Sequence, residues 1–158
     1  MVTRRDALRR LWRILGLVAL VEVAAAVGLY LWPRKPKARE GAYGGVVTAG
    51  PVDNFEAGTV TAFAKGQFYL VRLDDGGFLA LSRRCTHLGC TVPWSEESKS
   101  FPCPCHASVF DMTGDVKSPP APRPLDLLAI TIDGGVVRVD TRKRVQRQKF
   151  EPSQVVYL

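Results

Sequence analysis

The hydrophobic and polar positions divide the chain into one long apolar run followed by short strand-like segments. Residues 14–32 are apolar apart from Glu22, and a helix of this length spans roughly 28 Å, close to the hydrocarbon thickness of a bilayer. Tyr30 and Trp32 stand at the far end, as interfacial aromatic residues do, and Pro33 stops the helix. The pattern predicts one N-terminal transmembrane helix over residues 14–32.

From Val46 onward the pattern is that of β-strands. Short apolar runs between turn residues predict strands at 59–63, 68–73, 78–82, 127–132 and 136–140. Asp and Gly residues at 74–77 and 133–135 predict hairpin turns. We therefore expect an all-β fold, a small antiparallel domain over residues 46–158, interrupted at about 83–124 by a segment rich in Cys, His, Pro and Gly.

Two segments flank the predicted helix. Residues 1–13 include Thr3 to Arg9, which resemble a twin-arginine export signal; the plain basic flank of a signal anchor is the alternative. The run Ala24 to Ala26 has the form of a cleavage site, but apolar sequence continues beyond it, so we expect a retained anchor. Residues 33–45 contain Pro, Lys, Arg and Gly without an apolar period and predict a flexible tether.

Two charged features leave alternatives open. Glu22 is costly near the middle of a membrane unless it is neutral or partnered. Either it faces another membrane subunit, with Ala24 and Gly28 as small contact residues, or it is protonated and has no partner. The basic tail at 138–149 is interpreted first as a solvated surface strand; docking to an acidic partner or to anionic lipid is the alternative.

The positions of the charged residues, the cysteines and the histidines limit the classes of function that the chain can have. The net charge of +7 comes mainly from the segments beside the apolar run, and residues 44–158 are nearly neutral. A nucleic-acid-binding domain needs a basic face of its own, so we expect no nucleic-acid partner. All four cysteines and both histidines lie between Cys85 and His106, which makes this segment the candidate site.

The six residues form two boxes, one running from Cys85 to Cys90 (Cys-Thr-His-Leu-Gly-Cys) and one from Cys103 to Ser108 (Cys-Pro-Cys-His-Ala-Ser). Two Cys on one iron and two neutral His on the other can hold a 2Fe-2S cluster, at a higher potential than an all-Cys cluster has. One further cysteine then remains in each box, and a disulfide between them would persist only on an oxidising side of the membrane. The alternatives are a zinc site and a pair of disulfide-bonded loops with free His, both of which are colourless.

The boxes resemble those of the Rieske iron–sulfur proteins. The first box matches the quinol-oxidising branch of that family at every position, and the second matches except that Ala107 stands where Gly is usual. The resemblance extends over the anchor, the tether and the β domain. It implies a Rieske-like antiparallel β domain with an inserted cluster-binding subdomain and one 2Fe-2S cluster.

Carried over by position, the resemblance implies a set of roles for the box residues. Cys85 and Cys103 would bind the inner iron, and His87 and His106 would bind the outer iron near solvent. Ser108 would donate a hydrogen bond to a bridging sulfide.

The resemblance also implies roles around the cluster ligands. Cys90 and Cys105 would form the disulfide, and Leu88 would lie at the docking surface. Residues 118–122 would form the proline loop that covers the cluster's third side. Phe110 stands where the family often has a Tyr that donates to a cysteine sulfur. Because one donor is missing, we expect a lower potential, suited to menaquinol.

The function implied is that of the iron–sulfur subunit of a quinol:cytochrome c oxidoreductase, which is not catalytic alone. The subunit would take one electron and a proton from quinol, with His106 nearest the quinol, and pass the electron to a c-type haem while the tether lets the domain swing. Its partners would be a cytochrome b subunit and a c-type haem subunit in a dimeric complex. It would cross the bacterial inner membrane once, with the C-terminal domain in the periplasm.

Two other classes of Rieske protein also carry such cluster boxes. The alternative is the Rieske subunit of an arsenite oxidase, which serves a molybdenum subunit. A soluble ferredoxin or oxygenase component is disfavoured by Cys90, Cys105 and the apolar helix.

Overall fold

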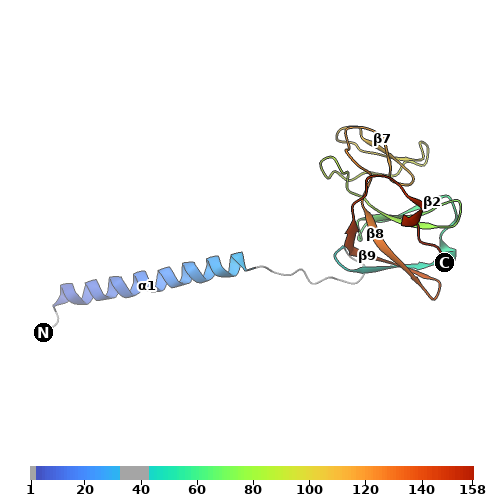
Figure 1. Ribbon diagram of the computed structural model, residues 1–158. Coiled ribbons are helices and arrows are strands. Elements are labelled where there is room, and N and C mark those ends of the chain that lie inside the picture. The colour runs from blue at the N-terminus through green and yellow to red at the C-terminus, as the bar shows by residue number, and fades with distance from the viewer. Residues whose placement is uncertain (1–2, 33–42) are drawn as a thin grey trace. The chain divides into compact units, whose positions relative to one another are not determined.

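The computed structural model of the chain describes residues 3–32 and 43–158, which form a single helix and a β domain (Figure 1). Most of the predicted tether, residues 33–42, lies outside the described residues.

Helix α1 (Arg4–Leu31) begins well before the apolar run that predicted it. Its N-cap is Thr3, whose hydroxyl oxygen accepts from the backbone N–H of Asp6 at 3.3 Å and donates to the Asp6 carboxylate at 2.6 Å. This cap satisfies the N–H of Asp6, and the Arg, Leu and Ala residues that follow are good helix formers. The prediction of a helix starting at residue 14 was therefore too short, and most of segment 1–13 is helical.

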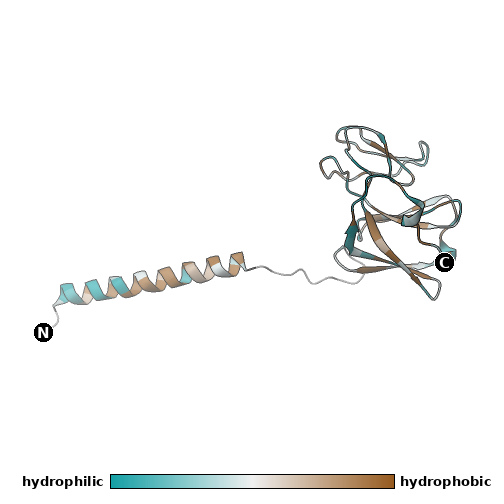
Figure 2. Cartoon of the chain, viewed as in Figure 1, coloured by the Kyte–Doolittle hydropathy of each residue, from teal (hydrophilic) through white to brown (hydrophobic). Residues whose placement is uncertain are grey.

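The composition of α1 changes along its length. Figure 2 shows hydrophilic residues in the first turns and mostly hydrophobic residues after them. Among the described residues, α1 is the one helix long and apolar enough to cross a membrane. None of its residues is buried within the chain.

The β domain consists of two antiparallel sheets, which confirms the predicted all-β fold. The strands are β1 (Val46–Pro51), β2 (Thr59–Phe63), β3 (Phe68–Arg72), β4 (Phe78–Ser82), β5 (Ser100–Pro102), β6 (Val109–Asp111), β7 (Val116–Ser118), β8 (Leu127–Asp133) and β9 (Val136–Val145), with short 3-10 helices η1 (Val52–Asn54) and η2 (Pro152–Gln154). The larger sheet has the order β1-β9-β8-β4-β3-β2, and the smaller one has the order β5-β6-β7. Figure 1 shows the small sheet as a separate lobe at one end of the domain.

The β3–β4 hairpin is buried on both faces and separates two cores. Phe68 and Leu70 of β3 pack into the core of the larger sheet, whereas Tyr69 and Val71 point into a second core. The second core also contains Cys85 and other residues of the inserted segment. The alternation along β3 therefore anchors the inserted lobe directly to the sheet.

Strand β9 is longer than the predicted 136–140 because it resumes pairing after a bulge. Ala129 pairs with Asp140, whereas Leu128 pairs with Arg144, so residues 141–143 are extra on β9. The four residues from 142 to 145 are exposed and carry no apolar alternation, which is why the pattern did not predict this end of the strand. Their exposure agrees with the expected solvated strand.

The bulge holds the last residues of the predicted tether on the domain. The buried Thr141 hydroxyl accepts from the N–H of Gly44 at 2.8 Å, and the N–H of Thr141 donates to the Gly45 carbonyl at 3.0 Å. The N–H of Tyr43 donates to the Lys65 carbonyl at 2.9 Å. Residues 43–45 therefore belong to the folded domain, and the prediction that the tether extends to residue 45 needs this correction.

Candidate metal centre

The first box forms a tight loop closed by its own backbone. The N–H of Cys85 donates to the Cys90 carbonyl at 2.8 Å, and the N–H of Gly89 donates to the Cys85 carbonyl at 2.9 Å. This closure requires a φ of +80° at Gly89, in the left-handed region that glycine adopts without steric cost.

The second box is closed by two backbone hydrogen bonds with the same spacing as in the first box. The N–H of Cys103 donates to the Ser108 carbonyl at 2.7 Å, and the N–H of Ala107 donates to the Cys103 carbonyl at 3.1 Å. Ala107 occupies the place of Gly89 and has a φ of +61°. The backbone thus keeps the glycine conformation although the residue has a side chain, at a cost of about 1–2 kcal/mol.

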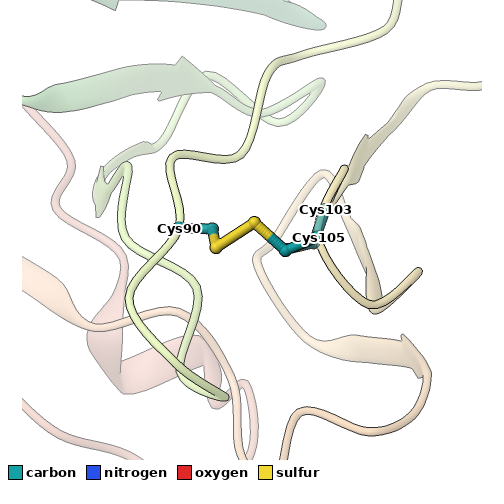
Figure 3. Close-up of side chains that lie close together, drawn as sticks. All are labelled: Cys90, Cys103 and Cys105. Carbon is teal, nitrogen blue, oxygen red and sulfur yellow. A yellow bond between two sulfur atoms is a disulfide. The ribbon is translucent and has the colours of Figure 1, made fainter.

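A disulfide joins the two loops. Cys90 and Cys105 are bonded at 2.08 Å, with their Cα atoms 6.7 Å apart (Figure 3). The Cys103 sulfur lies within 4.8 Å of both disulfide sulfurs. Because sulfurs bonded to each other are not thiolates, this group of three does not form a metal site.

The two remaining cysteines are free, buried and adjacent. Cys85 and Cys103 are each only 4% exposed. Burial raises the pKa of the Cys85 thiol and the neighbouring Cys103 raises it further, whereas the N–H of His87 and the Ser108 hydroxyl lower it. A buried pair of thiols surrounded by donors suits a bound cation, which takes thiolates and releases their protons.

The two histidines meet on the outer side of the loops. Their ring centroids are 4.9 Å apart and the rings are nearly perpendicular. His87 Nδ1 is buried and has no hydrogen-bond partner among the described residues, so this nitrogen is the atom on that ring suited to a metal. His106 is exposed, as is Leu88, which is 69% exposed beside them.

These four side chains fit the cofactor expected from the sequence. Two buried thiols and two imidazoles, one with an orphaned nitrogen, are the donor set of a 2Fe-2S cluster held by Cys₂His₂. In the two disulfide-joined loops the structure brings Cys85 next to Cys103 and His87 next to His106.

A third segment is tied to both loops. The N–H of Ala121, in the predicted proline loop, donates to the fully buried Ser108 hydroxyl at 3.0 Å. The Thr86 hydroxyl of the first loop donates to the carbonyl of Arg123. Residues 118–123 are therefore fastened to the first and second boxes, and the role of Ser108 toward a sulfide stays a prediction.

The sequence pattern missed Arg147, which ties the small lobe to the rest of the domain. This side chain is only 5% exposed. Its guanidinium donates to the Leu125 carbonyl at 3.0 Å, to the Gln154 side chain at 2.9 Å and to the carbonyl of Thr113. Nothing in the basic tail distinguishes it from exposed neighbours such as Arg142, because its partners come from distant segments.

Gly114 makes room for this guanidinium. A Cβ at that position would lie 2.6 Å from Arg147 Nη2, and the residue has a φ of +84°. Both the turn and the close approach therefore require glycine between β6 and β7.

Comparisons with known proteins identify the family. Residues 45–139 match the Rieske [2Fe-2S] domain family. The cytochrome b6-f complex iron-sulfur subunit 1 of Synechocystis sp. is 32% identical over 129 residues, which cover 71% of this chain and 72% of that protein. The chloroplastic cytochrome b6-f complex iron-sulfur subunit of Bigelowiella natans is 47% identical over 72 residues, which cover 44% of this chain and 29% of that protein.

In several curated relatives the match covers less than half of their length, for instance 44% in a Synechococcus sp. cytochrome b6-f complex iron-sulfur subunit. Among solved structures, the cyanobacterial plasma membrane Rieske protein PetC3 from Synechocystis PCC 6803 is 31% identical, with a TM-score of 0.49, over 60% of this chain and 98% of that chain. The family match names the iron–sulfur cluster, and the alternatives of a zinc site and of a metal-free loop pair are set aside on that ground.

Proposed function

Since the chain belongs to the Rieske [2Fe-2S] domain family, we propose that it is the iron–sulfur subunit of a quinol-oxidising cytochrome complex. The observation that carries this proposal is the arrangement of two free buried thiols and two neighbouring imidazoles in loops joined by a disulfide. Relatives named as subunits of cytochrome b6-f complexes support it.

We assign Cys85 and Cys103 as thiolate ligands and His87 and His106 as imidazole ligands. The buried thiols exclude water from one side of the site, and the disulfide and residues 118–123 hold the loops in place. When bound, the cluster gains and loses one electron at a potential raised by the neutral imidazoles.

The imidazoles also supply a place for a proton. His87 Nδ1 is the buried nitrogen, so the other nitrogen of that ring, Nε2, is left to hold or release a proton. The exposed His106 and Leu88 form the face that would meet quinol, with His106 as its proton acceptor. Electron and proton would thus leave quinol at one small surface.

We propose menaquinol as the electron donor of the complex and a c-type haem as the electron acceptor. Phe110 is fully buried in β6 and offers no hydroxyl to the sulfur atoms, which supports a low potential. The capped helix α1, with its basic first turns, supports a single-span anchor with the β domain on the periplasmic side of a bacterial inner membrane. The chain would belong to a dimeric complex with cytochrome b.

Purification of the complex tests this function. The native membranes are solubilised in mild detergent, the chain is captured by an affinity tag, and the spectra of the co-purifying cofactors are recorded. We expect b-type and c-type haem together with quinol-dependent haem reduction. Co-purification of molybdopterin without b-type haem would instead assign the chain to an arsenite oxidase and overturn the proposal.

A surface variant sharpens the test. Leu88→Ala should leave the cluster spectrum unchanged and slow quinol-dependent haem reduction severalfold, because it truncates the exposed side chain beside the histidines. Leu158→Ala is the matched control, since Leu158 is 80% exposed and lies outside both loops. Equal rates in the two variants would remove Leu88 from the docking surface.

A further inference from the structure

A pocket lies at the neck of the first loop, outside the four proposed cluster ligands. It has a volume of about 530 Å³ and is lined by Ala64, Gln67, Arg83, Arg84, Gly89 and Thr91. The N–H of Val92 donates to the Arg83 carbonyl at 2.9 Å, and Arg84 forms a β-bridge with Thr91. The pocket wall is therefore part of the ordered stem that carries the cluster loop.

The Tyr69 ring holds the Arg83 side chain in place. Its guanidinium lies 5.1 Å from the centre of the Tyr69 ring, a cation–π contact. The Tyr69 hydroxyl in turn donates to the Val92 carbonyl at 2.9 Å. Arg83 Nε is buried and lacks a hydrogen-bond partner in the part of the chain that the structure describes. A positive charge is thus fixed at the pocket although nothing described here neutralises it.

Arg84 brings a second positive charge to the same place. Its guanidinium lies along Gly89, where a Cβ would be 3.4 Å from Nη2. Within residues 3–32 and 43–158, neither Arg83 nor Arg84 forms a salt bridge. The lining contains no Asp or Glu, and Gln67 and Thr91 add an amide and a hydroxyl.

This combination of groups is suited to an oxyanion. Guanidinium groups bind phosphate through paired N–H donors, and an amide and a hydroxyl supply further hydrogen bonds. The volume lies within the range of small-molecule sites, about 300–1,000 Å³. We propose that this pocket binds a phosphate group, either free phosphate or the headgroup of an anionic lipid, beside the first cluster loop. Binding here does not depend on the quinol-oxidising function proposed above.

The experiment measures binding of inorganic phosphate to the full chain. The protein is held in uncharged detergent at constant ionic strength set with chloride, and phosphate is titrated by isothermal calorimetry. We expect saturable binding of one phosphate per chain. Arg84→Gln should weaken it about tenfold, as loss of one charged hydrogen bond does, and Thr91→Val should weaken it less.

Arg142→Gln is the control, since it removes the same charge from an exposed side chain that is paired with Asp140 at 2.9 Å. It should bind phosphate as the unaltered chain does. Equal affinity in Arg84→Gln and Arg142→Gln, or heat that never saturates, would overturn the proposal. The Thr91→Val variant keeps the test decisive if Arg84→Gln fails to fold.

A second arm separates the two sources of phosphate. Phosphatidylglycerol is added to the micelles, with phosphatidylcholine as the comparison. Competition by phosphatidylglycerol that is lost in Arg84→Gln would assign the site to a lipid headgroup. Saturable phosphate binding that phosphatidylglycerol does not affect would assign it to the free anion. Either result supports the pocket as a phosphate site.

Discussion

Replacing Ala107 with glycine should stabilise the protein, because the second loop holds this alanine in a conformation that suits glycine. Ala107 closes its loop as Gly89 closes the first one, by an N–H bond to the carbonyl of the cysteine that starts the box. Its φ of +61° lies in the left-handed region. Ala107→Gly leaves this hydrogen bond intact and removes only the Cβ.

The size of the effect follows from two opposing contributions. The left-handed conformation costs an alanine about 1–2 kcal/mol. Glycine gives the unfolded chain more freedom, which lowers the free energy of unfolding by about 0.4–1 kcal/mol. The net gain for Ala107→Gly is then about 0.5–1 kcal/mol, or a rise in Tm of roughly 2–5 °C for a domain of this size.

The matched variant is Gly89→Ala, which introduces the same strain in the first loop. Its new Cβ would lie 3.4 Å from the end of the Arg84 side chain, a flexible group that can move aside. We expect a loss of about 0.5–1 kcal/mol there. Thermal unfolding of the full chain in detergent, followed by circular dichroism at one scan rate, measures both. A lower Tm for Ala107→Gly, or no change in Gly89→Ala, would refute the equivalence of the two loops.

Two further substitutions test the lobe and the potential. Arg147→Met should lower the free energy of unfolding by about 3 kcal/mol, because it removes a charged donor from buried carbonyl groups. Arg142→Met, at an exposed position, should change the free energy of unfolding by less than about 0.5 kcal/mol. Denaturant titration measures both variants, and equal effects would contradict the role of Arg147. Phe110→Tyr should raise the midpoint potential of the cluster, because it adds a hydrogen-bond donor near the sulfurs. Phe150→Tyr, at the edge of the same core, should leave the midpoint potential unchanged. Voltammetry that shows no rise in Phe110→Tyr would refute this interpretation of Phe110.

The sequence predicted the parts of the fold that depend on local pattern. The bounds of β2 and β4 agree with prediction because a glycine comes directly before each apolar run, Gly58 before β2 and Gly77 before β4. The box residues were recognisable because metal ligands need particular side chains at short spacing. The start of α1 was missed because a cap at Thr3, rather than hydropathy, determines it.

The long-range contacts could not be predicted in this way. The attachment of residues 43–45 depends on Thr141, which is almost a hundred positions away in the chain. The burial of Arg147 depends on carbonyl groups of Thr113 and Leu125 that only the folded lobe brings together. Arg147 is of the same type as its exposed neighbours Arg142 and Arg144, so only the tertiary structure reveals its role.

The most direct test of the central assignment is the EPR spectrum of the purified full chain after reduction with dithionite. We predict a coloured protein whose reduced form gives the signal of one 2Fe-2S cluster with mixed Cys and His ligands, and whose signal is lost in Cys85→Ser. A colourless protein without an EPR signal, carrying a single zinc ion at these loops, would contradict the account.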